Sequence, residues 1–391
     1  MNNLWSAEEA GKCKNDLEFR VYTSNLLGRS DELVLHGGGN TSVKTKVDGE
    51  DILFVKGSGW DLVSIKEEGF APVKLKTLLE MSELDELSDS DMVSGQKAAM
   101  IDTKAPNPSV EAILHALIPF KYVDHTHADA VVTISNSVNG QEHINKLYPN
   151  YLIVPYVMPG FILAQTINKM AKDLDWSQCE GIILHNHGIF TFDDDAKISY
   201  DKMIEAVTLA EVFLEEKAYI EIEEKEVSCE VDMKEIQKII SKHKGYDVVA
   251  NLNQSPLALH YSSQENLKTF ATRGILTPEH IIRTKRVPLI VEGESLQEAL
   301  KKYKDDYLSY FEEFKKDEIC LSPTPNYMIV KNAGVVSFGK NKKEADIIND
   351  IVEHTMLAVL RADKLGGYKG ISLKDCFEME YWELEQAKLR K

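Results

Sequence analysis

Short runs rich in β-branched and aromatic residues alternate with longer amphipathic segments through roughly the first 225 residues of the chain. The short runs predict strands, and apolar positions that recur every three or four residues predict helices. Expected strands lie within DILFVKGSG (51–59), KYVDHTHADAVVTIS (121–135) and GIILHNHGIFTF (181–192). Expected helices lie within SVEAILHALI (109–118) and a long segment (193–222) that begins with acidic residues, which the helix dipole favours there. The alternation predicts a mixed α/β domain built in layers.

A charged passage at 223–247 is followed by a change of pattern, so we predict a domain boundary near residue 246. The first domain is expected over residues 1–240. A smaller C-terminal α/β domain, of unknown role, is expected over residues 246–391.

The segment 328–360 in the expected C-terminal domain is similar to the earlier segment 182–214. Gly188 aligns with Gly334, and Ala333 stands where the first segment has His187. A long helical pattern follows each glycine. One interpretation is a degenerate repeat that kept the fold and lost a ligand. The other is that any strand, glycine turn and amphipathic helix look alike.

Composition and charge narrow the possible classes of function. With 391 residues, of which 43% are hydrophobic and 28% charged, the chain can bury a substantial core. A formal net charge of −18 disfavours a nucleic-acid partner, which selects basic surfaces. The chain has no run of about 18 apolar residues, and its polar, acidic N-terminus does not resemble an export signal. We therefore expect no membrane partner and a cytoplasmic location. Five cysteines without a CxxC pair are typical of reduced thiols.

Two H-x-H pairs are the clearest candidates for chemistry. His125 and His127 lie in the second expected strand, where positions i and i+2 face the same way. His185 and His187 form another pair ahead of an apolar run, and strand geometry does not choose between them. Imidazoles bind divalent metals at about 2.0–2.1 Å, so three of them would form an open, catalytic type of site. The alternative for a pair taken alone is two hydrogen-bonded polar residues at a strand end.

A carboxylate and several candidate anion-binding groups accompany the histidines. Ser109 is expected to cap the helix that follows it, and such a helix start attracts anions. Glu111 is expected in the first helical turn, where it could serve simply as a partner of the helix dipole. Two glycine-rich turns, LHGGGN (35–40) and VKGSG (55–59), match neither GxGxxG nor the phosphate-loop pattern. Their amides are nevertheless of the kind that cradles a phosphate.

Taken in order and spacing, HGGGNTSVK, VKGSGWDL, NPSVEAILHALIP, DHTHADAVVTIS and LHNHGIFTFDDDA resemble the class II aldolase/adducin family over roughly residues 20–225. The likeness is nearest to the aldolase half of bifunctional rhamnulose-1-phosphate aldolase/lactaldehyde dehydrogenases. It implies a class II aldolase-like αβα core with a second, smaller α/β domain. The chain carries no dinucleotide fingerprint, so the redox activity is not expected.

The resemblance also implies site residues. The metal-binding histidine of the family directly precedes a glycine, which implies His125, His127 and His187 as ligands, with His185 beside them. Glu111 falls on the catalytic acid/base. The positions that the resemblance assigns to phosphate binding are Asn40, Lys56, Gly57, Ser58, Gly59 and Ser109. Some relatives carry a second phosphate-binding serine where this chain has Val110. A catalytic tyrosine from a neighbouring subunit is also implied, for which the candidates are Tyr151 and Tyr156.

The implied activity is that of a metal-dependent aldehyde-lyase. Such an enzyme reversibly cleaves a ketose 1-phosphate, for example rhamnulose 1-phosphate, to dihydroxyacetone phosphate and an aldehyde. The implied cofactor is Zn²⁺ or another divalent metal, the partner is a small phosphorylated sugar, and the assembly is a homo-oligomer. Two alternatives stay open: a sugar-phosphate 4-epimerase or decarboxylase of the same family, and a non-catalytic scaffold like adducin.

Overall fold

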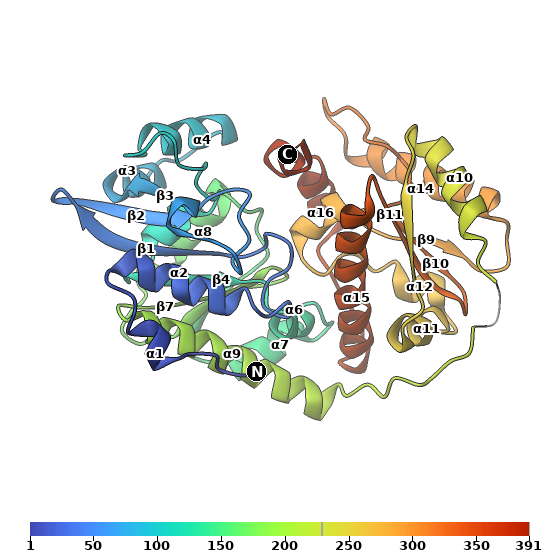
Figure 1. The fold of residues 1–391 in the computed structure, drawn as a ribbon, viewed down its shortest axis with the longest axis horizontal. Helices are drawn as coiled ribbons and strands as arrows, with labels where there is room; N and C mark the ends of the chain where they lie inside the picture. The colour runs from blue at the N-terminus through green and yellow to red at the C-terminus, as the bar shows by residue number, and fades with distance from the viewer. Residues whose placement is uncertain (228–229, 391) are drawn as a thin grey trace. The chain divides into compact units, whose positions relative to one another are not determined.

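The computed structural model describes residues 1–227 and 230–390, and the chain divides into two compact units. The first unit contains residues 1–135 and 141–213, and the second contains 136–140 together with the chain from Leu214 onward (Figure 1). The division falls inside a long helix, ahead of the boundary expected near residue 246. Among the described residues, each helix is either too short or too polar to span a lipid bilayer.

The first unit contains, within the described residues, a seven-stranded sheet in the order β3-β2-β1-β4-β7-β6-β5. β5 and β6 run parallel, and the other neighbours pair antiparallel. The strands are β1 (Asn40–Val47), β2 (Glu50–Lys56), β3 (Phe70–Lys74), β4 (Tyr122–Thr126), β5 (Tyr151–Val154), β6 (Gly181–Leu184) and β7 (Gly188–Asp193). The helices are α1 (Ala7–Ala10), α2 (Asp16–Leu27), η1 (Glu67–Gly69), α3 (Leu75–Ser82), α4 (Asp89–Ala98), α5 (Ala112–Leu117), α6 (Asp129–Ser135), α7 (Gly140–Leu147), α8 (Phe161–Met170) and α9 (Ala196–Lys217).

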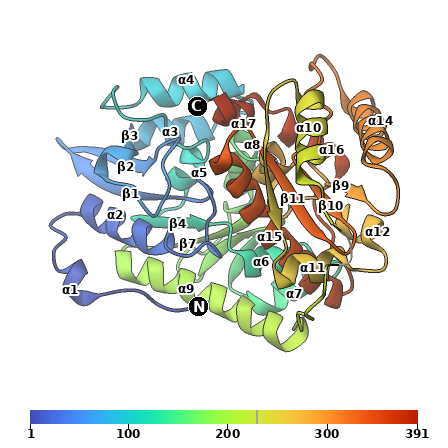
Figure 2. The ribbon, with the colours of Figure 1, turned by 45° about the vertical axis from the view of Figure 1, so that its right-hand side comes forward.

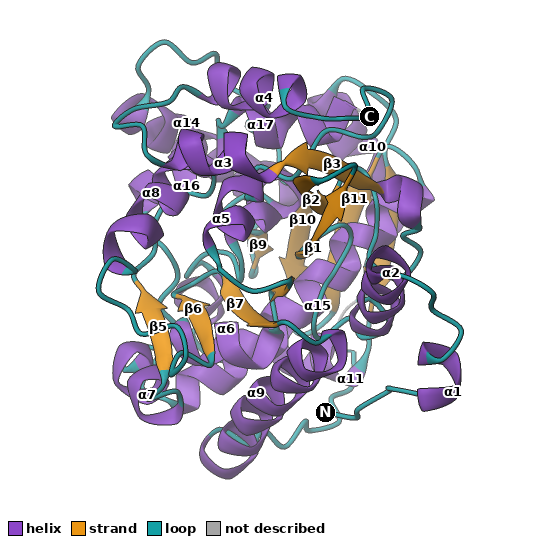
Figure 3. Cartoon of the chain, turned by 90° about the vertical axis from the view of Figure 1, so that its left-hand side faces the viewer, coloured by secondary structure: helices purple, strands orange, loops and turns teal. Residues whose placement is uncertain are grey.

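Alternating side chains along β4 determine what covers each face of this sheet. Asp124 points to the face where Arg20 of α2 pairs with its carboxylate and Ser199 of α9 donates a hydrogen bond to it. His125, the next residue, points to the opposite face, which α5 covers together with α3 and α8. Figure 3 shows β5, β6 and β7 side by side at one end of the sheet. The unit is therefore the αβα sandwich that was expected.

Two segments of this unit differ in detail from their sequence patterns. DAVVTIS, which continues an expected strand, forms helix α6 instead, because the chain turns after His127 and burial of its β-branched residues outweighs their strand propensity. GIILHNHGIFTF holds two strands, since β6 and β7 pair antiparallel across the turn at 185–187. Both turns lie next to histidines.

The second unit contains, within the described residues, a four-stranded sheet in the order β8-β11-β10-β9. Figure 2 labels β9, β10 and β11 of this sheet. β9 and β10 run parallel, and the other two pairs are antiparallel. The strands are β8 (Val249–Asn253), β9 (Leu289–Val291), β10 (Tyr327–Val330) and β11 (Gly334–Gly339). The helices are α10 (Met233–Lys244), α11 (Pro256–Ser262), α12 (Leu267–Ala271), η2 (Pro278–His280), α13 (Ile281–Thr284), α14 (Leu296–Phe314), α15 (Lys342–Lys364), α16 (Leu373–Glu380), α17 (Glu383–Gln386) and η3 (Ala387–Arg390).

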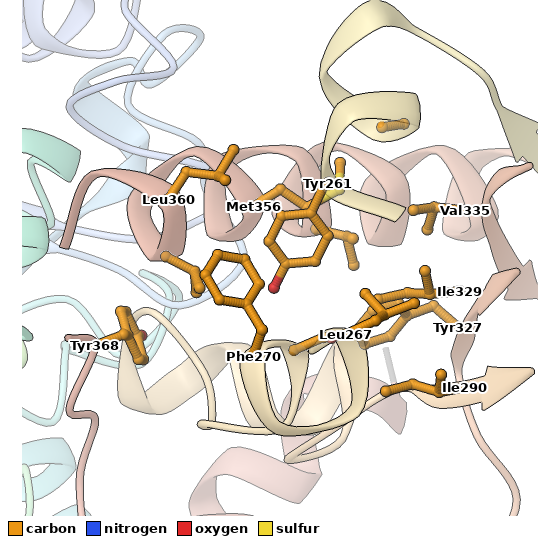
Figure 4. Packing of buried hydrophobic residues seen from close by; sticks show 14 of the residues in the cluster. Tyr261, Leu267, Phe270, Ile290, Tyr327, Ile329, Val335, Met356, Leu360 and Tyr368 are labelled. Carbon is orange, nitrogen blue, oxygen red and sulfur yellow. The ribbon is translucent and has the colours of Figure 1, made fainter. Parts of the chain in front are cut away.

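Both faces of this second sheet are covered by helices. The core shared with α11, α12 and α15 contains the strand residues Ile290, Tyr327, Ile329 and Val335 (Figure 4). The core shared with α10 and α14 contains the strand residues Leu289, Met328, Val336 and Phe338. Successive strand residues thus enter opposite cores, as the two-residue period of a strand requires.

The second sheet repeats the arrangement of β4-β7-β6-β5 in the first, with the same order and the same parallel and antiparallel pairs. Details of the hairpins agree as well. Asn186 and Asn332, each two residues before the hairpin's second strand, have φ of 60° and 56°. Thr191 and Ser337 each donate a side-chain hydrogen bond to the start of the following helix, at 3.0 and 2.8 Å. These shared details support a degenerate repeat, and the expected α/β fold class is confirmed.

Candidate metal centre

Three imidazoles converge where β4 ends and β7 begins. His125 lies in β4, His127 follows its last residue, and His187 directly precedes β7. One nitrogen from each ring lies within 4.8 Å of the other two, and Nε2 of His125 is 3.1 Å from Nε2 of His127. Two nitrogens on one tetrahedral ion lie about 3.3 Å apart when each bond is about 2.05 Å long. The spacing of the first pair therefore suits a shared cation.

The ring of His125 is held in an orientation that leaves one nitrogen for a metal. Its Nδ1 lies 3.0 Å from the carbonyl oxygen of Ile189. A carbonyl oxygen only accepts, so Nδ1 carries the proton and Nε2 presents its lone pair to the cluster. The ring is fully buried and stacks on Phe190 at 4.0 Å between centroids. A backbone carbonyl behind a ligating histidine is a common way to fix its tautomer.

The close approach of β7 to β4 explains why a glycine, Gly188, follows His187. A Cβ at this position would lie 2.3 Å from the carbonyl oxygen of Thr126 and 3.0 Å from Cε1 of His125. Any other residue would push β7 away from β4, and with it His187 away from the histidine pair. The glycine is needed for this close approach of two backbones.

His185 does not belong to the cluster, although an unbroken strand would direct it the same way as His187. Asn186 between them has φ of 60°, in the left-handed region, and this interrupts the strand alternation. Nδ1 of His185 instead lies 3.0 Å from the side-chain oxygen of Asn186. The turn conformation thus separates the two histidines.

Glu111 faces the three imidazoles with its carboxylate. Its Oε2 lies 3.6 Å from Nε2 of His125, and its Oε1 lies 3.9 Å from Nε2 of His187. Oε2 also accepts a 2.6 Å hydrogen bond from Nδ2 of Asn40. Oε1 is buried and has no hydrogen-bond partner among the described residues. A buried carboxylate oxygen left in this state beside three imidazoles fits a site built for a cation and its ligand.

Asn40 is held in turn by the buried His115 of α5. Its Oδ1 makes a short hydrogen bond with Nε2 of His115, and Nδ1 of that ring lies 2.8 Å from the hydroxyl oxygen of Ser42. Burial lowers the pKa of His115 well below its ordinary value, so the ring is neutral. Because an amide oxygen only accepts, the ring proton is on Nε2, and Ser42 donates to Nδ1. Sequence reasoning did not identify Ser42, since nothing in its neighbourhood distinguishes it from other strand serines.

The candidate phosphate-binding residues also come together. Lys56, which ends β2, is buried, and its Nζ donates to the carbonyl oxygen of Gly37 at 3.1 Å. The amide of Ser58 donates to the carbonyl oxygen of Asn107, and the amide of Ser109 donates to that of Lys56, at 2.9 and 3.1 Å. Nδ2 of Asn40 lies 3.2 Å from Oγ of Ser109. Both glycine-rich turns therefore border the segment that leads to Glu111, while Ser58 and Gly59 are exposed.

The expected role of Ser109 as a helix cap is wrong. α5 begins at Ala112, and Glu111 occupies the N-cap position with φ of −92° and no capping hydrogen bond from its side chain. Ser109 Oγ instead accepts from the amide of Glu111 at 3.2 Å. The carboxylate of Glu111 is directed at Asn40 and the histidines, so it cannot cap its own helix.

An ion pair behind β4 was not anticipated from the sequence. Arg20 and Asp124 are fully buried, and the guanidinium also donates to the carbonyl oxygens of Ser42 and Val123, each at 3.3 Å. These contacts join α2, β1 and β4 on the face opposite His125. An arginine in an ordinary helical segment gives no sign of such a partner, because the aspartate lies more than a hundred residues away.

Two family models match the sequence. The class II aldolase and adducin N-terminal domain matches residues 20–214, and the second domain of class II aldolases matches residues 228–389. The curated protein "Uncharacterized oxidoreductase YuxG" of Bacillus subtilis (strain 168) is 27% identical over 420 residues, which cover 100% of this chain and 60% of that protein. The chain thus spans less than two thirds of the length of this relative.

Solved structures resemble the first unit. The N-terminal class II aldolase domain of a conserved protein from Thermoplasma acidophilum is 38% identical, with a TM-score of 0.50, and the match covers 55% of this chain and 99% of that one. L-fuculose-1-phosphate aldolase from Thermus thermophilus is 15% identical with a TM-score of 0.34, covering 51% of this chain and 95% of that one. The similarity to the Thermus thermophilus structure is too low to assign a function. With both family models matched in order along the sequence, the chain belongs to the class II aldolase and adducin family.

Proposed function

We propose that the protein is a metal-dependent aldehyde-lyase that cleaves a ketose 1-phosphate, such as rhamnulose 1-phosphate, to dihydroxyacetone phosphate and an aldehyde. The observation that carries this proposal is the buried Oε1 of Glu111, which lacks a hydrogen-bond partner among the described residues and lies beside three converging imidazoles. A scaffold without activity has no physical need to bury a carboxylate in this way. The alternative of an adducin-like scaffold is therefore disfavoured.

The three histidines and Glu111 have different proposed roles in the reaction. His125, His127 and His187 would hold a divalent cation, which would supply Lewis-acid stabilisation of the charge that develops on the substrate oxygens when the carbon–carbon bond breaks. Glu111 would exchange the proton at the carbanion carbon through Oε1, because Oε2 is engaged by Asn40. Asn40 holds the carboxylate in place for this transfer.

The two glycine-rich turns would fix the substrate phosphate. Lys56 supplies a positive charge beside backbone amides of the 57–59 turn, and Ser109 supplies a hydroxyl group. Charge-assisted hydrogen bonds of this kind fix the register of a phosphorylated substrate. We propose Asn40, Lys56, Gly57, Ser58, Gly59 and Ser109 as the substrate-binding set, with Asn40 acting mainly through Glu111.

Zinc is the proposed metal, because three neutral imidazoles with open positions are typical of catalytic zinc, although other first-row divalent ions accept the same donors. We further propose a homo-oligomer and a cytoplasmic location. The remaining alternatives are a sugar-phosphate 4-epimerase and a decarboxylase. Either would use the same cation and carboxylate.

The test is a panel of ketose phosphates incubated with the purified chain of residues 1–391, with and without a chelator. Release of dihydroxyacetone phosphate that stops with chelator and returns with Zn²⁺ supports the lyase. Loss of a pentulose phosphate or evolution of carbon dioxide, without triose phosphate, would instead identify the epimerase or the decarboxylase.

Two variants test the ligand assignment. His127→Ala should lose both bound metal and turnover, whereas His185→Ala, which removes a histidine outside the cluster, should keep its metal. Elemental analysis of the purified proteins measures this. Full metal content in His127→Ala would refute the assignment.

A further inference from the structure

The second unit contains a cavity of about 350 Å³ that the proposed lyase does not use. It lies at the free edge of β9, between one face of α14 and the end of α12. The α14 residues that line it are Ala299, Lys302, Tyr303, Asp306, Tyr307 and Tyr310, at helical spacing along one face. Its volume is in the range of small-molecule sites.

The hydroxyl group of Tyr310 is the unusual feature of this cavity. The residue is only 7% exposed, and its hydroxyl oxygen is buried without a hydrogen-bond partner among the described residues. Burial raises its pKa, so the group stays protonated and can donate. Neighbouring Tyr307 differs, because its hydroxyl group bonds to Lys285, Glu380 and Tyr381 at 2.8–3.0 Å. Tyr310 lines the cavity, and a buried donor without an acceptor on such a residue indicates a ligand that supplies one.

Arg286 offers a second donor group at the same wall. Its guanidinium carbon lies 5.6 Å from the ring centroid of Tyr310, and the described residues give it neither an ion pair nor a hydrogen bond. The planar guanidinium suits two-point binding of a carboxylate. Arg286 thus lies over the ring of Tyr310, the residue whose hydroxyl group is unpartnered among the described residues.

The charges and apolar walls define the ligand further. The lining holds three cationic residues, Lys268, Arg286 and Lys302, against two carboxylates, Glu294 and Asp306. Lys268 is already paired with Glu294 at 3.0 Å. One net positive charge suits a monoanion, and the two carboxylates disfavour a dianionic phosphate ester. The apolar part of the lining is formed by Val287, Pro288, Leu289, Ile290 and the tyrosine rings.

We propose that this cavity of the second unit binds a small organic monocarboxylate with an apolar or aromatic body, whose carboxylate accepts hydrogen bonds from Arg286 and Tyr310. The proposal is independent of the lyase activity, because every lining residue belongs to the second unit and none is a metal-centre residue.

Calorimetric titration of the 391-residue chain with 3-phenylpropionate tests the proposal, with 3-phenylpropanamide as the uncharged match and inorganic phosphate as the alternative anion. We expect the carboxylate to bind and the amide to bind at least about tenfold more weakly, since the charged hydrogen bonds are lost. Equal binding of acid and amide would overturn the proposal. Displacement of the carboxylate by an equal concentration of phosphate would also overturn it.

Substitutions of Tyr310 and Arg286 test whether the carboxylate binds in this cavity. Tyr310→Phe removes no hydrogen bond of the free protein, so it should fold normally and bind about five- to tenfold more weakly. Arg286→Gln should bind more weakly still, and the exposed Tyr219→Phe should bind as the unmodified chain does. Unchanged affinity in Tyr310→Phe and Arg286→Gln would refute the assignment. The His127→Ala chain should keep its binding, and loss of binding there would place the carboxylate at the metal centre and refute the proposal.

Discussion

A single proton on His115 sets the direction of the hydrogen bonds that lead to Glu111. The neutral ring donates from Nε2 to the Asn40 oxygen, so the Asn40 nitrogen must face Glu111. If the Asn40 amide were flipped, its NH₂ group would face the N–H of His115 and its oxygen would face the carboxylate of Glu111, and neither contact is a hydrogen bond. The orientation of the carboxylate is thus determined at a distance from the cation site, by the hydroxyl group of Ser42 that donates to Nδ1 of His115.

The Asn40→Ala substitution separates positioning from metal binding. It leaves Oε2 of Glu111 without its 2.6 Å donor, while the three histidines keep their own contacts. We expect turnover to fall about ten- to a hundredfold, as for loss of a hydrogen bond to a buried charged group, with the metal content unchanged. Triose phosphate release and elemental analysis measure the two quantities. As a control, Asn150→Ala, which removes an exposed asparagine, should retain both; loss of metal in Asn40→Ala would contradict the positioning role.

The histidines show which parts of the site can be predicted from residue spacing. The H-x-H spacing predicted that His125 and His127 project together, and their rings do lie side by side. The same rule could not choose between His185 and His187, because it assumes a continuous strand. The choice depends on the left-handed backbone of Asn186, and asparagine adopts that conformation only in some of its contexts. A family likeness supplied what the spacing alone could not.

At the scale of elements, the approach of β7 to β4 is the feature on which the cluster depends. Gly188→Ala would place a Cβ 2.3 Å from the carbonyl oxygen of Thr126. We expect metal affinity to fall at least about tenfold and the free energy of unfolding to fall by about 1–3 kcal/mol, because the strands must separate. Gly95→Ala, in helix α4, is the matched control: its Cβ would lie 3.1 Å from the flexible end of Met81, and alanine favours helices, so the change should be close to neutral. Metal titration and chemical denaturation provide the measurements, and unchanged affinity in Gly188→Ala would contradict the steric argument.

Lys44 of β1 makes the stability of the first unit depend on pH. Its Nζ donates to the carbonyl oxygens of His115, Ile118 and Phe120, and burial lowers its pKa to about 7. The unfolded chain has a lysine pKa of about 10.4, so between these values the unfolded state binds more protons than the folded state. The contribution of the buried, neutral Lys44 to the free energy of unfolding is therefore fully present above about pH 10 and is lost as the pH falls through about 7.

The measurement compares denaturation curves of the unmodified chain and Lys44→Met between about pH 7 and pH 10. The free energy of unfolding of the unmodified chain should rise with pH relative to that of the variant. Lys46→Met changes an exposed lysine on the same strand and should leave the pH dependence as it was. Parallel curves for the unmodified chain and Lys44→Met would disprove the predicted linkage.

At the scale of the whole molecule, the two units share one arrangement of strands, but the candidate metal ligands lie only in the first among the described residues. The later half of the repeat was visible in the sequence, because glycine and phenylalanine recur at the same spacing around each hairpin. The earlier half was not visible, since β4 and β8 share few residue types. Only the strand register relates them: Phe190 faces His125 as Val336 faces Leu252. Register is a property of paired strands, so a single sequence gives little information about it.

This register identifies the positions of the second unit that correspond to the candidate metal ligands of the first. Leu252, Gln254 and Ala333 take the places of His125, His127 and His187, and Nε2 of Gln254 donates to the carbonyl oxygen of Ala333 at 2.9 Å. A Cβ at Gly334 would lie 2.4 Å from the carbonyl oxygen of Asn253, much as a Cβ at Gly188 would lie 2.3 Å from that of Thr126. The close approach of strands is therefore present in the second unit without the imidazoles, and we expect one metal ion per chain.

Restoring the imidazoles tests whether the two units are equivalent. In a chain that already carries His127→Ala, and so should bind no metal, the substitutions Leu252→His, Gln254→His and Ala333→His should restore about one ion per chain, because three imidazoles on this backbone geometry suffice for a divalent cation. Elemental analysis after dialysis against Zn²⁺ gives the stoichiometry, and circular dichroism verifies the fold. Turnover should not return, since the second unit has no counterpart of Glu111 held by an asparagine at hydrogen-bonding distance among its described residues. A folded quadruple variant that binds no metal would show that the likeness of the two hairpins does not extend to the geometry on which the first site depends.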